Sequence, residues 1–310
     1  MIDRCDYLVF DISSVLYRTF YAQKTDDDIT IAGLATHTAL TTLNKYFKTY
    51  YPTMGVVMAF DRLSWRKGYM ASNLAVSDKP YKGTRRKDLS TSQQLKYERF
   101  LSHLREFEQL ITDHTTIVTL ASDGLEADDL IAGFVRLHAG ANIVVISSDS
   151  DLLQLMRYDN CQIITPATGK PQSLAEYYND PDFYTFLKCI RGDTADNIQS
   201  AYPGVRATSV KEAYDDEYKR TAMMKQTWTN EKKTQYLVED LFNENELLIH
   251  LDKQPEPIIR KIDNTIAESW SREKHFSMFH ILKFLGKYDL NKIKDNIDQY
   301  IPLLSRPIKR

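Results

Sequence analysis

The stretch Ile143-Val144-Val145-Ile146-Ser147-Ser148-Asp149-Ser150-Asp151 joins a short apolar run to a pair of aspartates. Four consecutive β-branched residues are typical of a buried strand in a parallel sheet. Three earlier runs, at residues 7–10, 56–60 and 116–120, have the same character. We therefore predict that these four runs are strands of one parallel sheet.

Segments with helical periodicity separate these runs and replace them in the second half of the chain. Such alternation favours an α/β fold, with a parallel sheet flanked by helices. The segments are 34–50, 92–111 and 127–138 between the strands, and 183–190, 210–228, 232–251 and 275–285 after Pro181. Because the strand pattern stops there, we expect residues 1–185 to form the α/β domain and residues 186–310 a smaller all-helical domain.

The composition bounds the class of protein. The chain has 310 residues, of which 43% are hydrophobic, enough for one large core or two unequal ones. Its three cysteines are far apart, which favours reduced thiols over a disulfide frame or a zinc site. No stretch approaches the roughly 18 apolar residues of a membrane span, and the first residues lack an apolar signal core. We expect a soluble, cytoplasmic monomer that does not bind membranes.

Aspartates follow three of the predicted strands, namely Asp11, Asp61 and Asp149. Because the carboxyl ends of parallel strands meet at one edge of a sheet, where ligands bind, we expect these acids to converge. Further acids lie in local groups: Glu126, Asp128 and Asp129 at the start of a helical segment, Asp151 beside Asp149, and Asp193 with Asp196. Singly, each acid is an ordinary helix cap or turn residue, but their joint occurrence favours a site.

Carboxylates that lie together need cations to balance their charge. Oxygen ligands without neighbouring Cys or His suit Mg²⁺ or Mn²⁺ rather than Zn²⁺. Two such ions, about 3.5–4 Å apart, stabilise the attacking and the leaving oxygen when a phosphodiester is cleaved. No Ser-His or Cys-His pair is apparent, so water is the expected attacker. The acids therefore predict a site for two Mg²⁺ ions, with Mn²⁺ as a substitute.

Residues 62–105 form a basic strip in a chain whose formal net charge is −2. The strip holds eleven Lys or Arg residues and three acids. Its densest parts are Trp65-Arg66-Lys67 and Lys79-Pro80-Tyr81-Lys82-Gly83-Thr84-Arg85-Arg86-Lys87. Cations interleaved with aromatic rings are typical of surfaces that bind nucleic acid, although most charge runs are only solvated helix faces. Since the strip follows Asp61 directly, we expect an arch over the acids, with a flexible loop at residues 68–80.

Together these motifs resemble the 5′ nuclease family, which includes flap endonucleases and the 5′-exonuclease domains of bacterial DNA polymerases. The matching stretches occur in order between residues 5 and 255: Phe10-Asp11, Phe60-Asp61, Trp65-Arg66-Lys67, 81–85, 125–132, 148–152 and 192–198. The resemblance implies a PIN-like α/β nuclease domain with a helical arch, followed by a helical DNA-binding domain.

The resemblance also implies roles for individual residues. It assigns the first metal ion to Asp11, Asp61, Glu126, Asp128, Asp129 and Asp149, which hold or support it, and the second to Asp151, Asp193 and Asp196, with Asp149 touching both. Asp149 and Asp151 count as catalytic, as do Lys82 and Arg85, which would steer and polarise the scissile phosphate. The implied DNA-binding residues are Arg66, Lys67, Tyr81, Lys82, Arg85, Arg86 and Arg206, with the Tyr81 ring as a platform for a base.

One segment departs from the family pattern. Family members follow the Gly-Asp motif with a glycine-rich hairpin that grips duplex backbone and often binds K⁺. Here Pro203-Gly204-Val205 is present, but residues 206–209 read Arg-Ala-Thr-Ser. Without glycine, backbone N–H groups approach a phosphate less easily, so neither K⁺ binding nor the usual duplex contact follows from the resemblance. A similarly altered hairpin is a feature of the T-even phage ribonuclease H branch, which this chain resembles.

We interpret the chain as a structure-specific, Mg²⁺-dependent 5′→3′ exonuclease and flap endonuclease. It would cut DNA flaps or RNA primers near a 5′ end during replication and leave 5′-phosphate products. A phosphohydrolase that forms an aspartyl-phosphate on small substrates is one alternative, but it needs an acid where the chain has Ser13. A non-catalytic protein that binds branched DNA is another, and the complete set of family acids disfavours it.

The C-terminal segments 276–285 and 298–304 are candidates for contacts with a sliding clamp or a single-strand-binding protein. Residues 299–304, Gln-Tyr-Ile-Pro-Leu-Leu, loosely resemble a clamp-binding peptide. The simpler interpretation is a helix that completes the core of the small domain. For a phage protein, the expected location is the host cytoplasm.

Overall fold

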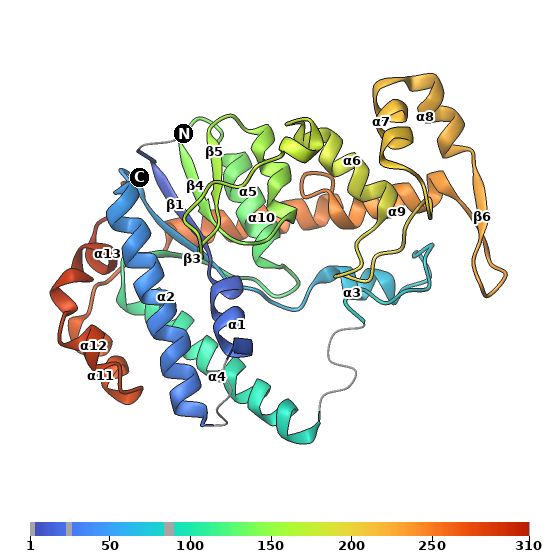
Figure 1. Ribbon diagram of the computed structural model, residues 1–310. Helices are drawn as coiled ribbons and strands as arrows, with labels where there is room; N and C mark the ends of the chain where they lie inside the picture. Colours follow the sequence, from blue (N-terminus) through green and yellow to red (C-terminus); the bar gives the residue numbers. More distant parts are fainter. Residues whose placement is uncertain (1–3, 23–26, 84–89, 310) are drawn as a thin grey trace.

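The computed structural model describes residues 4–22, 27–83 and 90–309. A five-stranded parallel sheet lies at its centre, with helices on both faces (Figure 1). The strands are β1 (Tyr7–Asp11), β2 (Gly55–Ala59), β3 (Val118–Leu120), β4 (Ile143–Ile146) and β5 (Cys161–Ile164). Their order is β3-β2-β1-β4-β5, so the chain fills one side of β1 first and then returns to the other side. The predicted α/β class is confirmed, and β5 is a strand that the prediction did not include.

Side chains of each strand alternate between two hydrophobic layers. Phe10 faces one layer beside Met58 and Ile146 of the neighbouring strands. Val9 faces the other layer beside Val57. Because both faces are covered, the strands read as continuous apolar runs, and this pattern made them recognisable in the sequence.

The first layer is covered by α1 (Ile12–Ala22), α2 (Asp28–Tyr50), α4 (Thr91–His114) and α11 (Met278–Lys287). The second layer is covered by α5 (Ala127–Leu137), α10 (Glu256–Ser271) and the 3₁₀ helix η1 (Asp151–Arg157). The other helices are α3 (Trp65–Met70), α6 (Pro181–Arg191), α7 (Ala207–Asp215), α8 (Glu217–Met224), α9 (Val238–Ile249), α12 (Asn291–Lys294), α13 (Ile301–Ser305) and the short 3₁₀ helices η2 (Ala175–Tyr177) and η3 (Ile297–Gln299). None of the helices in the described ranges combines the length and apolar character of a membrane span.

Two elements of the second half differ from the prediction. Strands β6 (Thr227–Thr229) and β7 (Gln235–Leu237) form an antiparallel hairpin where we predicted helix. Its cross-strand pair Trp228–Tyr236, with ring centroids 5.1 Å apart, supplies the aromatic contact that favours strands. Helix α10, which contains Pro257 and follows Pro255, was also not predicted. Proline is well tolerated in a first turn, and α10 begins between these two prolines. The predicted all-helical character of the second half is therefore wrong at the hairpin.

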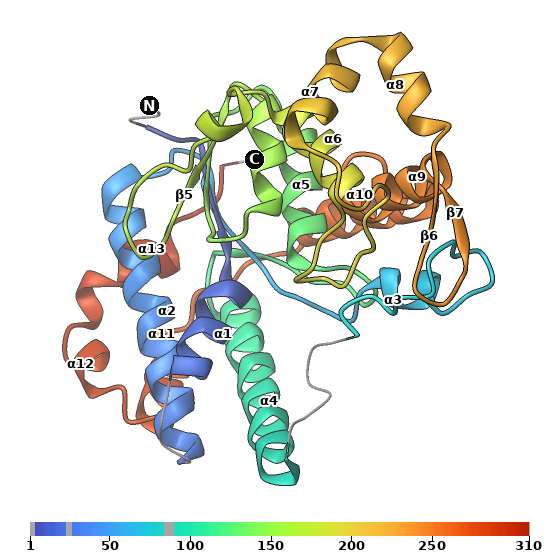
Figure 2. The same cartoon turned by 45° about the vertical axis from the view of Figure 1, so that its right-hand side comes forward.

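The predicted division into residues 1–185 and 186–310 stays a prediction. Hydrophobic packing divides the later residues into two sets. Helices α6 to α9 and the hairpin share one small cluster, whereas α10 to α13 pack on the two layers of the sheet. In Figures 1 and 2, α7, α8 and the hairpin lie away from the sheet, and α11 to α13 lie beside α2.

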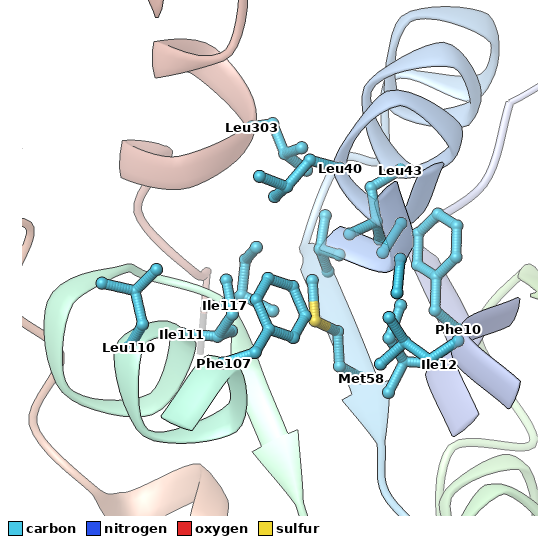
Figure 3. Packing of buried hydrophobic residues seen from close by; sticks show 14 of the residues in the cluster. Phe10, Ile12, Leu40, Leu43, Met58, Phe107, Leu110, Ile111, Ile117 and Leu303 are labelled. Atoms are coloured by element: carbon cyan, nitrogen blue, oxygen red, sulfur yellow. The ribbon is translucent and has the colours of Figure 1, made fainter. Parts of the chain in front are cut away.

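The apolar side chains of the C-terminal segment are part of the core. Tyr300, Leu303 and Leu304 are buried in the first layer, and Figure 3 shows Leu303 pointing toward Leu40 of α2. The backbone N–H of Thr116 donates to the carbonyl of Leu304 at 2.9 Å, which ties the segment to the chain just before β3. This packing encloses the side chains that a clamp contact would need to expose, and it places them in a sheet layer rather than in the small cluster of α6 to α9.

Replacing Leu303 with Ala is expected to lower the free energy of unfolding by about 2–5 kcal/mol, because it leaves a cavity in a packed layer. Leu74 is 72% exposed, so Leu74→Ala is a matched control with an expected change below about 0.5 kcal/mol. Urea unfolding followed by circular dichroism measures both. Equal stability of the two variants would show that the C-terminal segment does not complete the core.

Candidate active site

The predicted acids converge at the carboxyl end of the sheet, where the chain order reverses between β1 and β4. An open cleft of about 400 Å³ lies there. Eight of the nine acids predicted as metal ligands line it: Asp11, Asp61, Glu126, Asp128, Asp149, Asp151, Asp193 and Asp196. They come from both halves of the chain. Asp129 is the exception.

Two buried serines hold the strand-end aspartates. The Ser147 hydroxyl donates to Asp11 Oδ2 at 2.7 Å and accepts from the backbone N–H of Asp149 at 3.0 Å. The Ser13 hydroxyl accepts from the backbone N–H of Asp61 at 2.9 Å. Both serines are fully buried. The sequence analysis assigned no role to Ser147, and a small residue after a strand carries no signal that would have found one.

The N-terminus of α5 holds a second group of acids. Asp61 Oδ1 accepts from the backbone N–H of Ala127 at 2.8 Å. Glu126 and Asp129 form a reciprocal capping box, in which each side chain accepts from the other's backbone. The alternative interpretation of these acids as helix caps is thus correct for Glu126 and Asp129, and the cap positions Glu126 at the cleft.

Arg66 does not occupy a position from which it can contact a phosphate. It is 1% exposed, and its Nη2 and Nη1 donate to Asp129 at 2.8 and 3.1 Å. Nη1 also donates to Glu126 at 3.2 Å, and Nε donates to the carbonyl of Leu248 at 2.7 Å. The guanidinium further lies 4.9 Å from the Trp65 ring centroid. The predicted phosphate contact of Arg66 is therefore wrong for this structure, because buried carboxylates use its donors.

The Asp129 carboxylate likewise has several hydrogen-bond donors within the protein. It is fully buried, and its carboxylate accepts from Arg66, from the Gln254 amide and from the backbone N–H of Glu126. One oxygen each of Glu126, Asp128 and Asp129 lies within 4.8 Å of the others, the spacing of a metal-ligand group. Arg66 and Gln254 already donate to the Asp129 oxygens. This contact pattern favours a supporting role for Asp129, which positions Glu126, over direct binding of a metal ion.

Tyr81 and Lys82 also turn toward the acids. The Tyr81 hydroxyl lies 2.9 Å from Glu126 Oε2 and 2.8 Å from Asp196 Oδ2. Tyr81 is 5% exposed, so its ring is not a platform for a base in this structure and that prediction is wrong here. Lys82 Nζ pairs with Glu126 and lies 3.5 Å from Asp196 Oδ2. Both side chains thus join acids from the two halves of the chain.

Lys188 of α6 is a site residue that the sequence analysis missed. Its Nζ pairs with Asp151 and donates to Asp193 Oδ2 at 2.8 Å. It is thus a cation between two acids that were assigned to one metal ion. A single lysine on a helix is indistinguishable in the sequence from a solvated one, so only the packing of α6 against η1 reveals it.

Gly192 shapes the loop that carries Asp193. Its φ is +70°, and a Cβ at this position would lie 2.5 Å from the carbonyl oxygen of Ile198. The Asp193 Oδ1 atom accepts from the backbone N–H groups of Ala195 at 2.7 Å and Asp196 at 3.2 Å. The Gly-Asp-x-x-Asp spacing therefore builds a closed turn that places both aspartates at the cleft.

Desolvation and mutual repulsion shift the pKa values of the clustered acids. Burial, followed by the Asp11 charge, raises the pKa of Asp61 to about 6. Desolvation, followed by the Asp151 charge, raises the pKa of Asp149 to about 7. Burial also raises the pKa of Asp128. Although burial opposes it, Lys82 and Arg66 lower the pKa of Glu126. A cluster in which several acids resist ionisation favours bound cations.

Two further predicted DNA-binding residues, Lys67 and Arg206, do not line the cleft. Lys67 is exposed on α3. Arg206 is exposed immediately before α7, beside an open cavity of about 610 Å³ that Tyr202 and Gly204 also line. Arg85 and Arg86 lie outside the described residues, as does the part of the predicted arch at residues 84–89. DNA contacts of these residues stay predictions, and the resemblance still gives no basis for K⁺ binding at the altered hairpin.

The donor set of the cleft fits hard divalent ions. The carboxyl oxygens are concentrated at one edge of the sheet, and the three cysteines are buried elsewhere in the fold. Oxygen-only donors suit Mg²⁺ or Mn²⁺. The residues that would hold such ions are the eight acids that line the cleft.

The fold and the acidic cleft together define a class of protein. A family model described as "5′-3′ exonuclease, N-terminal resolvase-like domain" matches residues 6–183. The chain belongs to this family, which confirms the resemblance to 5′ nucleases.

Individual relatives extend this finding. The chain is 24% identical to ribonuclease H of Enterobacteria phage T4 over 306 residues, which cover 94% of this chain and 95% of that protein. It is 30% identical to DNA polymerase I of Chloroflexus aurantiacus over 128 residues, and so spans only 13% of that protein's length. A structure of the flap endonuclease of bacteriophage T5, as a pseudo-enzyme-product complex with DNA and metal ions, shares the fold with a TM-score of 0.61 at 19% identity. That match covers 86% of this chain and 99% of the other.

Arg66→Met is expected to lower the free energy of unfolding by about 3–5 kcal/mol, because it leaves the Asp129 carboxylate buried without its partner. The neighbouring Lys67 is exposed, so Lys67→Met is the matched control and should change stability by less than about 0.5 kcal/mol. Urea unfolding measures both. If Arg66→Met kept wild-type stability and only weakened DNA binding, the result would support the predicted contact between Arg66 and a phosphate.

Binding of Mn²⁺ is expected to strengthen as pH rises through the window set by Asp61 and Asp149, whose pKa values are raised to about 6 and about 7. Below these pH values protons occupy the two carboxyls and must leave when a cation binds. Calorimetry in two buffers of different ionisation enthalpy should show net proton release near pH 6.5 and none well above both pKa values. Proton release that is absent throughout would contradict the proposed ligands.

Proposed function

We propose that this protein is a Mg²⁺-dependent phosphodiesterase that cuts nucleic acid near 5′ ends, as a 5′→3′ exonuclease and flap endonuclease. The observation that carries the proposal is the convergence of eight carboxyl groups on one cleft at the reversal point of a parallel sheet. Membership in the 5′-3′ exonuclease family supports this chemistry.

The chain's own residues would divide the work in the cleft. The Asp11 carboxylate accepts from Ser147 and the Asp61 carboxylate from the backbone N–H of Ala127, so their oxygens are placed before a substrate arrives. Bound divalent ions would neutralise the acids and stabilise the charge that develops on the phosphate oxygens. Without that neutralisation the carboxylates would repel a polyanion. Lys82 is the one cation among the described residues of the cleft lining, and a single positive charge does not offset eight acids.

Lys82 and Lys188 would exchange their present partners when cations bind. Each ammonium now pairs with carboxylates, Lys82 with Glu126 and Lys188 with Asp151. When cations take over those carboxylates, both lysines would be free to donate to a phosphate oxygen. Lys82 is placed for this role because it lines the cleft. Its catalytic role, predicted from the family, is thus part of the proposal.

The substrate class follows from the relatives. Similarity along the whole chain to a phage ribonuclease H supports RNA paired with DNA as one substrate. The fold shared with a flap endonuclease supports branched DNA with a free 5′ end as another. We therefore propose removal of RNA primers and 5′ flaps in replication, with 5′-phosphate products.

Asp149→Asn and Asp151→Asn are each expected to reduce the cleavage rate by at least about 100-fold, because each removes an anionic oxygen from the cation site. Affinity for a 5′-flap substrate in the absence of divalent ions should persist. Asp298 is exposed outside the cleft, so Asp298→Asn is a matched control that should cleave like wild type. The assay is cleavage of a 5′-labelled flap and of an RNA–DNA duplex in Mg²⁺ and, separately, in Mn²⁺.

The same experiment separates the alternatives. Tight binding of the flap without cleavage in either metal would identify a non-catalytic branched-DNA-binding protein. Hydrolysis of a chromogenic aryl phosphate without cleavage of nucleic acid would identify a small-molecule phosphohydrolase. Ser13, at the position where that enzyme needs an acid, is fully buried and hydrogen-bonded to the Asp61 backbone.

A further inference from the structure

The two ends of the basic strip meet at a second cavity, outside the acidic cleft. Arg62 and Arg105, the first and last cations of residues 62–105, both line an open cavity of about 310 Å³. We call it the arginine cavity. Its other walls come from the end of β3 with Thr119, and from the end of α10 with Ser269 and Arg272. Residues from three separate parts of the chain thus supply cations and hydroxyl groups to one place.

The charges of the arginine cavity do not cancel. Arg62 Nη2 lies 2.6 Å from both carboxylate oxygens of Glu108, and its Nε lies 4.0 Å from the exposed carboxylate of Asp123. Arg105 is exposed and forms no ion pair within the described ranges. Asp113 is the only other acid on the lining, which also carries Arg105 and Arg272. The lining itself thus carries three arginines and two acids, Glu108 and Asp113.

Lys274 does not itself line the arginine cavity, but charged residues of the lining act on it. Its Nζ atom is buried and has no hydrogen-bond partner among the described residues. Burial and then Arg272 lower its pKa to about 8, while Asp113 opposes them, and both of these neighbours line the arginine cavity. A buried ammonium without an acceptor is costly unless an anion completes it.

We propose that the arginine cavity binds phosphate groups of a nucleic-acid strand that passes Asp61 on its way out of the acidic cleft. The position supports this, because Arg62 directly follows Asp61 and its Nη1 donates to the Asp61 carbonyl at 3.0 Å. Guanidinium and hydroxyl donors on one wall suit phosphate oxygens. The inference rests on the proposed nuclease function for the identity of the strand, but not for the anion itself.

The salt dependence of binding tests the proposal. A 12-nucleotide oligothymidylate is bound to the full chain in EDTA, and fluorescence anisotropy gives the affinity over a series of KCl concentrations. Arg105→Gln, Lys274→Gln and the double variant are compared with Lys292→Gln, which removes an exposed lysine of α12. Removing one cation that binds a phosphate should reduce the slope of log affinity against log salt by about 0.7, and removing both by about 1.4.

A second arm identifies the source of the phosphate. Thymidine 5′-monophosphate is titrated calorimetrically into the wild-type protein and the double variant. A reduced slope with the strand supports the proposal, whether or not the mononucleotide also binds more weakly. If the substitutions weaken binding of the mononucleotide alone, the proposal of a nucleic-acid strand as the ligand is wrong, and the cavity is a site for a free phosphate ester. Wild-type slopes in both single variants and in the double variant would overturn the site itself.

These outcomes are independent of cleavage, because EDTA removes the divalent ions. Lack of cleavage by the wild-type protein in Mg²⁺ and Mn²⁺ would defeat the nuclease proposal and leave the anion site standing. Because Arg105 is exposed, its substitution should not disturb folding, and circular dichroism verifies this for each variant.

Discussion

Repulsion among eight carboxyl groups in one cleft is the constraint on which the rest of the site depends. A protein can hold such a group only if cations, hydrogen bonds or protons offset the repulsion. All three are present: Lys82 and Lys188 pair with acids, Ser147 donates to Asp11, and desolvation raises the pKa values of Asp61 and Asp149. The compensation is incomplete, because the described lining of the cleft carries eight acids and one lysine.

The compensating cations also connect distant parts of the chain. Arg66 joins α3 to α5 through Asp129 and to α9 through the Leu248 carbonyl. Tyr81 and Lys82 join Glu126 of the first half to Asp196 of the second. The segment that begins the basic strip is therefore built into the acid cluster. A movement of this segment would change the surroundings of acids in both halves together.

Much of the fold and of the acid set could be predicted, because those features have local signals. Buried parallel strands are continuous apolar runs, and an aspartate after such a run is visible in the sequence. Strand β5 escaped prediction because Gln162 interrupts its short apolar run. The burial of Arg66 and the role of Lys188 depend on α9 and on the packing of α6, and a basic residue carries no mark of its eventual partner. The roles of Ser13 and Ser147 could not be predicted either, because a serine also gives no indication in the sequence of the residue that it will contact.

The position of the C-terminal segment has a consequence for the order of folding. Leu303 and Leu304 complete the layer that packs against β1 and β2, and the Leu304 carbonyl accepts from Thr116. These contacts join residues separated by most of the chain. During synthesis, this layer cannot be completed until the ribosome has passed residue 304. Until then, one face of the nascent sheet stays partly exposed. Such long-range closure is slow, and exposed apolar surface of an unfinished polypeptide is prone to aggregation.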